Sequence, residues 1–235
     1  MKTALITGAN KGLGRETARR LITAGHTVYI GARDERRCEE AATSLGGRPV
    51  LIDVTDDDSV WAAAERIREE VGHLDVLVNN AGVLGPGNDA RGTTAADLRI
   101  AYETNVFGVV RVTRAFLPLL EESAAPVVVN VSSGLGSSTM AGDPDRFASI
   151  LPAYYPALAY NSSKAALNSL TVQYARANPK MRINSVDPGH TATDLNGHSG
   201  TQTVAEGADI IVRLAMVGPD GPSGGFYGSK GPIPW

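Results

Sequence analysis

The sequence Tyr160-Asn161-Ser162-Ser163-Lys164 places a phenol and an ammonium four residues apart. On a helix, these two positions are neighbours on one face, with Cβ atoms roughly 5–6 Å apart. An ammonium at that distance favours the phenolate, so we expect Lys164 to lower the pKa of Tyr160 from its ordinary value of about 10. A tyrosine with such a pKa can exchange a proton near neutral pH. Because tyrosine and lysine are common on helices, an amphipathic side chain beside a solvated charge explains the pair equally well.

The composition indicates an ordinary globular protein. Of 235 residues, 43% are hydrophobic and 20% are charged, which suits one domain over residues 1–235. The net charge of −3 argues against a nucleic acid or an anionic membrane as partner. The start of the chain lacks the layout of a signal peptide, and no apolar run approaches the ~20 residues of a membrane span. We therefore expect a cytoplasmic location.

The cysteine and the histidines predict neither a disulfide nor a metal site. Cys38 is the single cysteine, so no intrachain disulfide framework exists. The histidines show no metal-ligand spacing, and we expect no bound metal. They are His26, His73, His190 and His198.

Short apolar runs alternate with longer helical patterns. The runs are rich in Val, Ile and Leu with little apolar–polar alternation, as in strands buried on both faces of a parallel sheet. They cover residues 3–7, 27–31, 49–54, 75–79, 126–131, 182–186 and, more weakly, 225–227. Helices are expected over residues 12–24, 34–45, 56–71, 94–120, 157–177 and 203–217. The alternation predicts an α/β Rossmann fold, a doubly wound parallel sheet of about seven strands.

One connection breaks this alternation. Residues 134–156 are rich in Gly, Ser and Pro. Long connections without secondary structure are uncommon in compact domains and are often functional. We expect this segment to be an inserted loop.

A glycine-rich turn with the spacing G-x-x-x-G-x-G lies between the first predicted strand and the first predicted helix. Glycines there allow a tight turn and the close approach of backbone to a pyrophosphate at the helix N-terminus. A plain strand–helix turn is the simpler explanation, but the position of this one favours dinucleotide binding. The residues expected to bind are Gly8, Asn10, Lys11, Gly12, Leu13 and Gly14.

The end of the second predicted strand bears on the choice of cofactor. Sites that prefer NAD hold an acid there for the ribose 2′-hydroxyl, whereas an arginine accommodates the 2′-phosphate of NADP. This chain has Ala32 in the place of the acid, followed by Arg33, and we interpret Asp34 as the N-cap of the next helix. Lys11 adds a second positive charge. Both cations are also explained as solvated surface charges, but together they favour NADP(H).

Seven motifs in this order resemble the short-chain dehydrogenase/reductase family. The resemblance covers nearly the whole chain. After the glycine loop come Asp53-Val54, Asn79-Asn80-Ala81-Gly82, Asn105-Val106-Phe107-Gly108, Val129-Asn130-Val131-Ser132-Ser133-Gly134, the Tyr160–Lys164 pair and Asp187-Pro188-Gly189-His190-Thr191-Ala192-Thr193.

The resemblance implies a role for each catalytic candidate. Tyr160 would be the general acid or base at the substrate oxygen, and Lys164 would lower its pKa and hold the nicotinamide ribose. Ser133 would donate a hydrogen bond to the substrate oxygen, where negative charge develops. Asn105 would hold a water that links Lys164 to solvent. Ser132 competes with Ser133 for the serine role, and the register before Gly134 favours Ser133.

The resemblance also implies contacts to the cofactor. Asp53 and Val54 would border the adenine, and the backbone at Thr191 would meet the carboxamide. Thr193 would support the carboxamide or the phosphates, and His190 would form only a wall of the site. The other residues implied are Asn80, Ala81, Gly82, Pro188 and Gly189, together with Tyr160 and Lys164.

The long interval before Tyr160 departs from the pattern of many family members. Tyr160 follows Ser133 by 27 positions, as in carbonyl-reductase-like members, whose insertion covers the helix face that others use for tetramer contacts. We expect a monomer, or at most a dimer through another surface. Tyr154 and Tyr155 have no lysine four residues later, so we expect them to pack or to line the pocket.

The motifs together predict an NADPH-dependent carbonyl reductase that converts a ketone or aldehyde to an alcohol reversibly. The alternative is a non-catalytic NADP-binding regulator or redox sensor, since a fold does not fix a function. Such a protein would be expected to lack the tyrosine, the lysine or the serine, and here all three are present together with Asn105. An epimerase or dehydratase of the family's longer branch is a third alternative, but 235 residues leave little room for its extra substrate domain.

Overall fold

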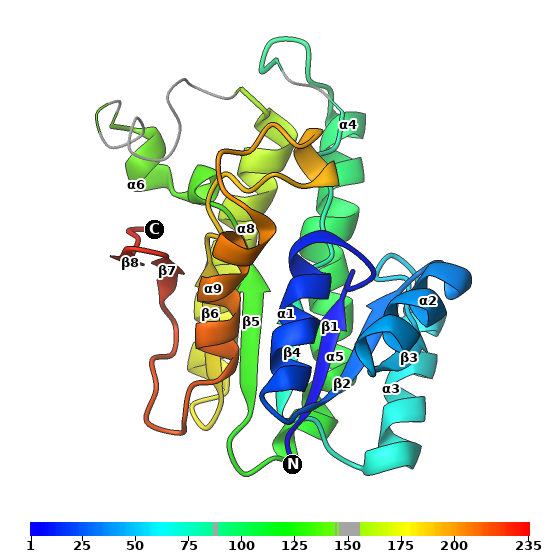
Figure 1. The fold of residues 1–235 in the computed structure, drawn as a ribbon. Helices are drawn as coiled ribbons and strands as arrows, with labels where there is room; N and C mark the ends of the chain where they lie inside the picture. Colours follow the sequence, from blue (N-terminus) through cyan, green and yellow to red (C-terminus); the bar gives the residue numbers. More distant parts are fainter. Residues whose placement is uncertain (87–88, 144, 146–155) are drawn as a thin grey trace.

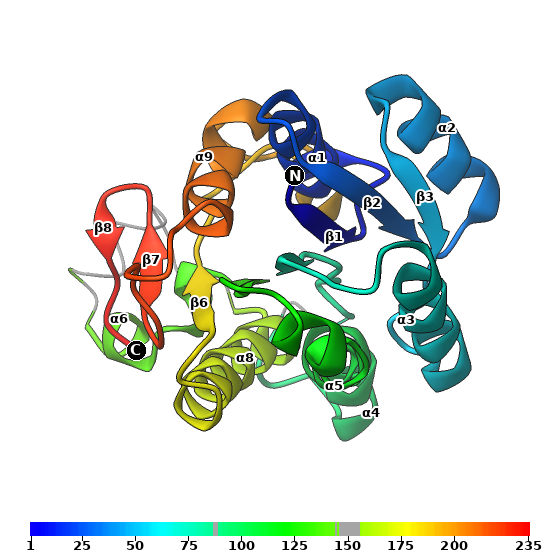
Figure 2. The same cartoon turned by 90° about the horizontal axis from the view of Figure 1, so that it is seen from below.

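A mostly parallel sheet runs through the middle of the molecule, and helices cover both of its faces (Figures 1 and 2). The computed structural model describes residues 1–86, 89–143, 145 and 156–235. Within these residues the sheet has eight strands in the order β3-β2-β1-β4-β5-β6-β7-β8. The strands are β1 (Thr3–Thr7), β2 (Thr27–Ala32), β3 (Arg48–Leu51), β4 (Val76–Asn79), β5 (Val127–Val131), β6 (Arg182–Val186), β7 (Phe226–Gly228) and β8 (Gly231–Pro232).

The predicted α/β fold is confirmed. Each of the seven apolar runs overlaps one of the strands β1 to β7 with ends that agree within three residues, and these strands pair in parallel. The last strand, β8, was not predicted. It is two residues long and pairs antiparallel with β7, and no apolar run marks it because it lies at the edge of the sheet.

The helices follow most of the predicted segments, and their caps are visible in the sequence. Asp34 caps the second helix by accepting a hydrogen bond from the backbone N–H of Arg37, as predicted. Thr203 and Glu206 form a capping box at the start of the last helix. The helices are α1 (Gly12–Thr23), α2 (Glu35–Leu45), α3 (Asp57–Val71), α4 (Ala95–Tyr102), α5 (Gly108–Glu121), α6 (Ser138–Ala141), α8 (Leu158–Ala177) and α9 (Val204–Ala215).

The helix predicted over residues 94–120 is interrupted. A π-helical turn, η1 (Glu103–Phe107), separates α4 from α5. Single π-turns inside helices are frequently found at functional sites. This one contains Asn105, so the interruption changes where that side chain points relative to a continuous helix.

Two apolar clusters, one on each face, hold the helices to the sheet. Leu5 of β1 packs in the cluster that includes α3 and α5, whereas its neighbours Ala4 and Ile6 pack in the cluster that includes α1, α2 and α9. Successive side chains of a strand point to opposite faces, so burial on both faces demands an uninterrupted apolar run. Figure 2 shows the two helix layers on either side of the sheet, with α4 and α8 on the side of α3 and α5.

Strand register aligns the carboxyl ends of four strands at one edge. Ile6 of β1 pairs with Val78, Asn79 of β4 pairs with Asn130, and Val131 of β5 pairs with Val186. The chain order reverses between β1 and β4, and ligands of such sheets bind beside this switch point. The loops after β1, β4, β5 and β6 therefore meet at the upper end of the sheet in Figure 1.

A chain of buried polar side chains fixes α8 against this part of the sheet. Asn79 donates to Asn130 Oδ1 over 2.9 Å, and Asn130 donates to Thr171 Oγ1 over 2.9 Å. The Thr171 hydroxyl lies 2.8 Å from that of Ser185 on β6. Because buried polar groups are costly unless hydrogen-bonded, these contacts favour a single register of α8 on β4, β5 and β6.

Gly136 brings the loop after β5 into direct contact with α8. It lies in the short 3-10 helix η2 (Gly134–Gly136), and a Cβ added there would lie 2.6 Å from the backbone carbon of Lys164 and 2.8 Å from the backbone nitrogen of Ala165. Any larger side chain must push α8 away from β5.

We predict that Gly136→Ala lowers the free energy of unfolding by about 1–3 kcal/mol, the usual penalty for overpacking. Urea unfolding measures the change. Gly142→Ala is the matched control in the same segment, because a Cβ there would lie 3.4 Å from its nearest atom, Ser138 O. Equal stability of the two variants would show that the contact between Gly136 and α8 is not tight.

Candidate active site

The candidate site lies at the carboxyl ends of β1, β4, β5 and β6, beside the first turns of α8. Each predicted site residue belongs to one of the loops there, to the start of α1, to the segment just after β2 or β3, to the π-turn η1 or to α8.

Tyr160 and Lys164 lie on one face of α8, as their spacing predicts. Their exposed fractions are 7% and 4%, and Lys164 Nζ lies 5.5 Å from the centroid of the Tyr160 ring. The ammonium donates a hydrogen bond of 2.8 Å to the backbone oxygen of Val131, the last residue of β5. Burial lowers the pKa of Lys164 from 10.5 to about 8, because a charged amine is disfavoured away from water.

Asn105 ties the loop after β4 to α8. Its side-chain amide donates to Val83 O over 2.8 Å and to Ser163 Oγ over 2.9 Å, and its side-chain oxygen accepts from the backbone N–H of Val83. Ser163 in turn donates to the backbone oxygen of Tyr160 over 2.7 Å. Ser163 stands inside the Tyr160–Lys164 motif, but its role in this contact was not predicted, since nothing in sequence links it to Asn105.

Gly82 keeps open the space above Lys164 and Asn105. A Cβ at this position would lie 3.3 Å from Asn105 Oδ1 and 3.6 Å from Lys164 Nζ. A side chain there would fill the space into which both polar groups face.

The two serines after β5 differ in accessibility. Ser132 is 2% exposed and donates a hydrogen bond of 2.6 Å to Asn168 Oδ1 on α8. Ser133 is partly exposed, and its hydroxyl accepts from the backbone N–H of Leu135 over 3.2 Å. The Ser132 hydroxyl is therefore engaged in packing, whereas the Ser133 hydroxyl is partly accessible with its proton available to donate.

The glycine loop is braced by Asn80 from the end of β4. Its side chain donates to the backbone oxygens of Thr7 and Gly8 over 2.8 and 3.1 Å, and the Ala81 N–H donates to Thr7 Oγ1. A Cβ at Gly14 would lie 2.5 Å from Asn80 Nδ2, so that position needs glycine. Gly8 has a φ of 63°, in the left-handed region that favours glycine.

The glycine loop leads directly into α1. The helix begins at Gly12, so its first N–H groups have no partner within the helix and form an anion-binding end. Leu13 packs into the cluster of α1 and α9, which fixes the start of the helix on the sheet.

Basic side chains gather beside the glycine loop. A hollow of about 410 Å³ there is lined by Asn10, Lys11, Arg15, Arg37, Glu40, Ala41, Ser44 and Asp194. Arg33 is exposed at the start of the turn between β2 and α2. Arg15 and Arg37 were not predicted, although Arg37 stands four residues after Arg33 and the spacing of two basic residues was a usable signal.

Asp53 and Val54 follow β3. The Asp53 carboxylate accepts hydrogen bonds from the N–H and the hydroxyl of Thr55 over 2.9 and 2.7 Å. Burial raises the pKa of Asp53 and these hydrogen bonds lower it, and on balance the pKa is lowered. Val54 is buried against Gly108, where a Cβ would lie 3.0 Å from the valine side chain.

The loop after β6 is held by its own backbone. Gly189 has a φ of 74°, and the Thr191 hydroxyl donates to Pro188 O over 3.1 Å. Thr193 begins the 3-10 turn η3 (Asp194–Asn196) with a capping box to Asn196. The backbone oxygen of His190 accepts from the N–H of Gln202.

Asp187 joins the loops after β5 and β6. Its carboxylate accepts from the N–H of Gly189 over 3.0 Å and from the N–H of Gly134. Burial raises the pKa of Asp187 against the effect of these two hydrogen bonds. The sequence motif included this residue, but its bridging position was not predicted.

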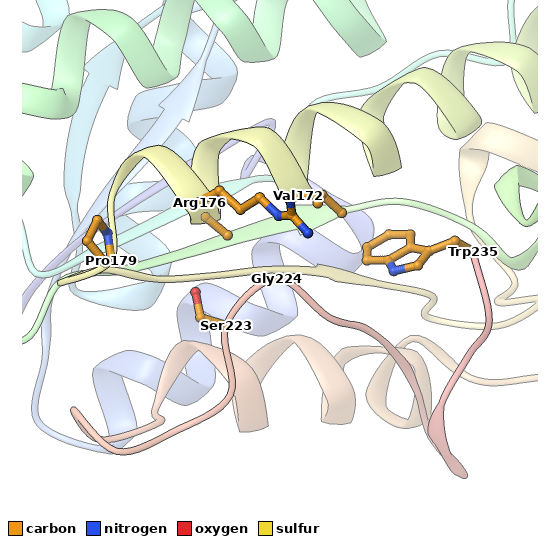
Figure 3. Close-up of a pocket in the computed structure, with 7 residues that line it drawn as sticks. Val172, Arg176, Pro179, Ser223, Gly224 and Trp235 are labelled. Atoms are coloured by element: carbon orange, nitrogen blue, oxygen red, sulfur yellow. The ribbon is translucent and has the colours of Figure 1, made fainter.

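A second hollow, shown in Figure 3, is separate from this site. It has a volume of about 330 Å³ and lies between the end of α8, the segment before β7 and Trp235. None of the predicted site residues lines it. Its residues are Val172, Ala175, Arg176, Pro179, Ser223, Gly224 and Trp235.

Part of the predicted insertion falls outside the described residues. Residues 134–143 form η2 and α6, but Tyr154 and Tyr155 and most of the rest of the loop are not described. Elsewhere in the described chain, no group of three or more His, Cys, Asp or Glu side chains is arranged to hold a metal ion. No helix among the described residues is long and apolar enough to cross a membrane.

Comparisons with known proteins bear on the family and the fold of the chain. The family model for short chain dehydrogenases matches residues 2–203. The short-chain dehydrogenase anuI of Penicillium roqueforti is 38% identical over 225 aligned positions, covering 91% of this chain and 88% of that protein. The (+)-neomenthol dehydrogenase of Capsicum annuum is 31% identical over 301 aligned positions, covering 97% of this chain and 95% of that protein.

A solved structure extends the likeness to the whole fold. The crystal structure of NADPH-bound carbonyl reductase from chicken fatty liver superposes with a TM-score of 0.87 at 28% identity, covering 100% of this chain and 99% of that one. Together with the match to the family model, this confirms the resemblance read from the motifs. The chain belongs to the short-chain dehydrogenase/reductase family and is an oxidoreductase by class.

Proposed function

We propose that this protein is an NADPH-dependent reductase that converts a ketone or aldehyde to an alcohol, reversibly. The observation that carries the proposal is the buried Tyr160–Lys164 pair on α8, at the edge of the sheet where the glycine loop lies. The printed names of similar proteins, a carbonyl reductase and a neomenthol dehydrogenase, agree with a small-molecule carbonyl or alcohol substrate.

The residues of the candidate site fit a nicotinamide dinucleotide. The absence of a side chain at Gly82 leaves space above Lys164 and Asn105, which suits a ribose ring. The start of α1 and the glycine loop suit a pyrophosphate. Asp53 and Val54 would border the adenine, and Pro188, Gly189, Thr191 and Thr193 would line the nicotinamide end. A nicotinamide cofactor supplies a hydride when it is bound.

Tyr160 would donate its phenolic proton to the substrate oxygen as negative charge develops there. Lys164 would stabilise the resulting phenolate by its charge. Ser133 would donate a second hydrogen bond to the same oxygen, since its hydroxyl is accessible whereas that of Ser132 is held by Asn168. Asn105 and Ser163 would hold the first turn of α8 in place, and we propose that Asn105 also supports the water that resupplies the proton.

The basic side chains beyond the glycine loop favour NADPH over NADH. Lys11 and Arg37 line the hollow there, and Arg33 is exposed at the strand end that would face the ribose 2′-position. Asp34, the residue after Arg33, is engaged as the N-cap of α2. Guanidinium groups bind phosphate through charge-assisted hydrogen bonds, which supports the proposed cofactor.

A non-catalytic NADP-binding regulator is the alternative, and turnover decides between the two. We also propose a monomer, or a dimer through a surface other than that of the insertion. The cytoplasmic location stays a prediction from the sequence.

We predict that Tyr160→Phe lowers kcat by at least about 10²-fold, because general acid catalysis typically contributes 10²–10⁴-fold. NADPH binding should stay within about twofold, since the ring remains. A panel of ketones and aldehydes, followed by NADPH absorbance, measures turnover, and NADPH fluorescence measures binding. Tyr174→Phe, on the same helix and half-buried, is the matched control. Near-normal turnover in Tyr160→Phe would refute the assignment, and no turnover in the wild type would favour the regulator.

We predict that Lys164→Met stabilises the fold at pH 7 while abolishing turnover. A pKa lowered from 10.5 to about 8 corresponds to on the order of 3 kcal/mol against burying the charge, since one pKa unit is about 1.4 kcal/mol. The variant also loses the hydrogen bond to Val131, which offsets part of this difference. We therefore expect its free energy of unfolding to exceed that of the wild type by about 1–2 kcal/mol.

The stability that Lys164→Met gains over the wild type should decrease as the pH rises. Between pH 8 and 10.5 the unfolded chain binds the Lys164 proton and the folded chain does not, so the wild type gains stability relative to Lys164→Met as the pH rises. Urea unfolding at pH 7 and pH 10 measures the difference. Lys180→Met, at an exposed position, should show no such trend, and a constant difference for Lys164→Met would contradict burial as the cause.

We predict that the wild type binds NADPH more tightly than NADH and that Arg33→Ala weakens NADPH binding about 10-fold or more, as expected for hydrogen bonds to a charged group. NADH binding should change less than about twofold, since NADH has no 2′-phosphate. Calorimetry measures both. Arg66→Ala is the matched control, because Arg66 pairs with Glu70 on α3 and neither residue lines the hollow. Preference of the wild type for NADH would overturn the cofactor assignment.

A further inference from the structure

An ion pair joins the glycine loop to the segment after β6. Lys11 Nζ lies 2.7 Å from Asp194 Oδ2. The other carboxylate oxygen, Oδ1, lies 2.8 Å from His198 Nε2. The carboxylate of Asp194 thus lies between Lys11 of the glycine loop and His198 of its own segment. The Lys11 ammonium, together with His198, lowers the pKa of Asp194.

The segment that carries Asp194 is preformed. Its base is closed by the backbone bonds between Ala192 and Gln202 and between Gln202 and His190, over 2.9 and 3.0 Å. Inside it, Asn196 donates to Thr191 O over 2.9 Å. Asp194 is therefore presented to Lys11 from a fixed position.

His198 is held in a disfavoured conformation by these contacts. Its φ is 61°, the one positive φ outside glycine in the described part of the chain, and its N–H donates to Thr193 O over 2.9 Å. Non-glycine residues in this region of φ are uncommon. The closed arrangement of the segment is thus maintained partly by the side-chain contact of His198 with Asp194.

Charge in the adjoining hollow is distributed unevenly. Three basic side chains line it, Lys11, Arg15 and Arg37. Among the described residues, Lys11 alone of these has a carboxylate partner, because Arg15 donates to Ser44 Oγ over 3.1 Å and the other acid of the hollow, Glu40, pairs with Arg36. The structure therefore neutralises the one cation that belongs to the glycine loop.

We propose that Asp194 competes with the 2′-phosphate for Lys11 and thereby lowers the preference of the protein for NADPH over NADH. This inference rests on the proposed NADPH dependence. Without cofactor, Asp194 holds the ammonium, and when a 2′-phosphate enters the hollow, Lys11 exchanges the carboxylate for the phosphate. The exchange frees the segment of Asp194 from the glycine loop.

The energetics favour such an exchange. The side chains of Lys11 and Asp194 are 58% and 49% exposed, and an ion pair exposed to this extent contributes little, because water screens it. A phosphate carries up to about two negative charges and accepts several charge-assisted hydrogen bonds, so it outcompetes one carboxylate. NADH has no such group and leaves the pair intact. Asp194 should therefore weaken the binding of NADPH but not that of NADH.

The test is the affinity of the full-length protein for NADPH and for NADH, measured by calorimetry. In Asp194→Asn, which keeps the shape of the side chain, the Kd for NADPH should fall about 2–5-fold, the equivalent of up to about 1 kcal/mol. The Kd for NADH should be unchanged. In a Lys11→Met background the same substitution should have no effect, because the partner for which the two anions compete is gone.

Glu40→Gln is the matched control. It removes one negative charge from the same hollow without touching Lys11, so it should tighten NADPH binding clearly less than Asp194→Asn does. Equal tightening in Glu40→Gln and Asp194→Asn would mean a general charge effect and would overturn the exchange. Weakening of both cofactors in Asp194→Asn would mean that the pair clamps any dinucleotide, and would overturn it too.

The proposed function and this inference fail separately. A wild type that binds NADH as tightly as NADPH would refute the proposed cofactor. A wild type that prefers NADPH, with the same preference in Asp194→Asn, would refute the competition for Lys11 alone.

Discussion

The ammonium of Lys164 has to be buried beside Tyr160, and much of the structure around the site is arranged to permit this. It is 4% exposed and its hydrogen bond goes to a backbone oxygen, not to an acid. A carboxylate in place of the Val131 carbonyl would neutralise the positive charge beside the Tyr160 phenol. A carbonyl satisfies one N–H and leaves the positive charge available. The burial therefore lowers the stability of the fold, and other contacts must offset that loss.

Those contacts are the ones that fix α8 to the sheet. Gly136 allows the loop after β5 to touch the backbone of α8, and Ser132 and Asn168 link the same two elements. The polar chain through Asn130 and Thr171 adds a second line of contact. As a result the end of β5 supplies both the acceptor for Lys164 and the backbone that carries Ser133. The positions of Tyr160 and of Ser133 both follow from this one docking interaction.

The sequence predicted those features that local physics decides. Uninterrupted apolar runs identified β1 to β7 because both faces of the sheet are covered, and Asp34 was recognisable as a cap from its place before α2. The spacing of Tyr160 and Lys164 was sufficient for their shared helix face. By contrast, the π-turn at Asn105, which contacts Ser163, and the contact of Lys11 with Asp194 involve chain segments far apart in sequence, and β8 is only two residues long, too short to form an apolar run. No local pattern specifies them, so they were not predicted.

The two lysines of the site illustrate opposite uses of the same side chain. Lys164 is enclosed, has one fixed acceptor and has its pKa lowered by burial, so its position is defined before any ligand arrives. Lys11 is more than half exposed and has a carboxylate partner that water and ions can replace. A group that must act on a proton benefits from a fixed place and a tuned pKa, whereas a group that must recognise an arriving anion benefits from a partner that it can release. Burial decides which of these roles each lysine is suited to, and the position of each on the sheet edge decides which part of a dinucleotide it would meet.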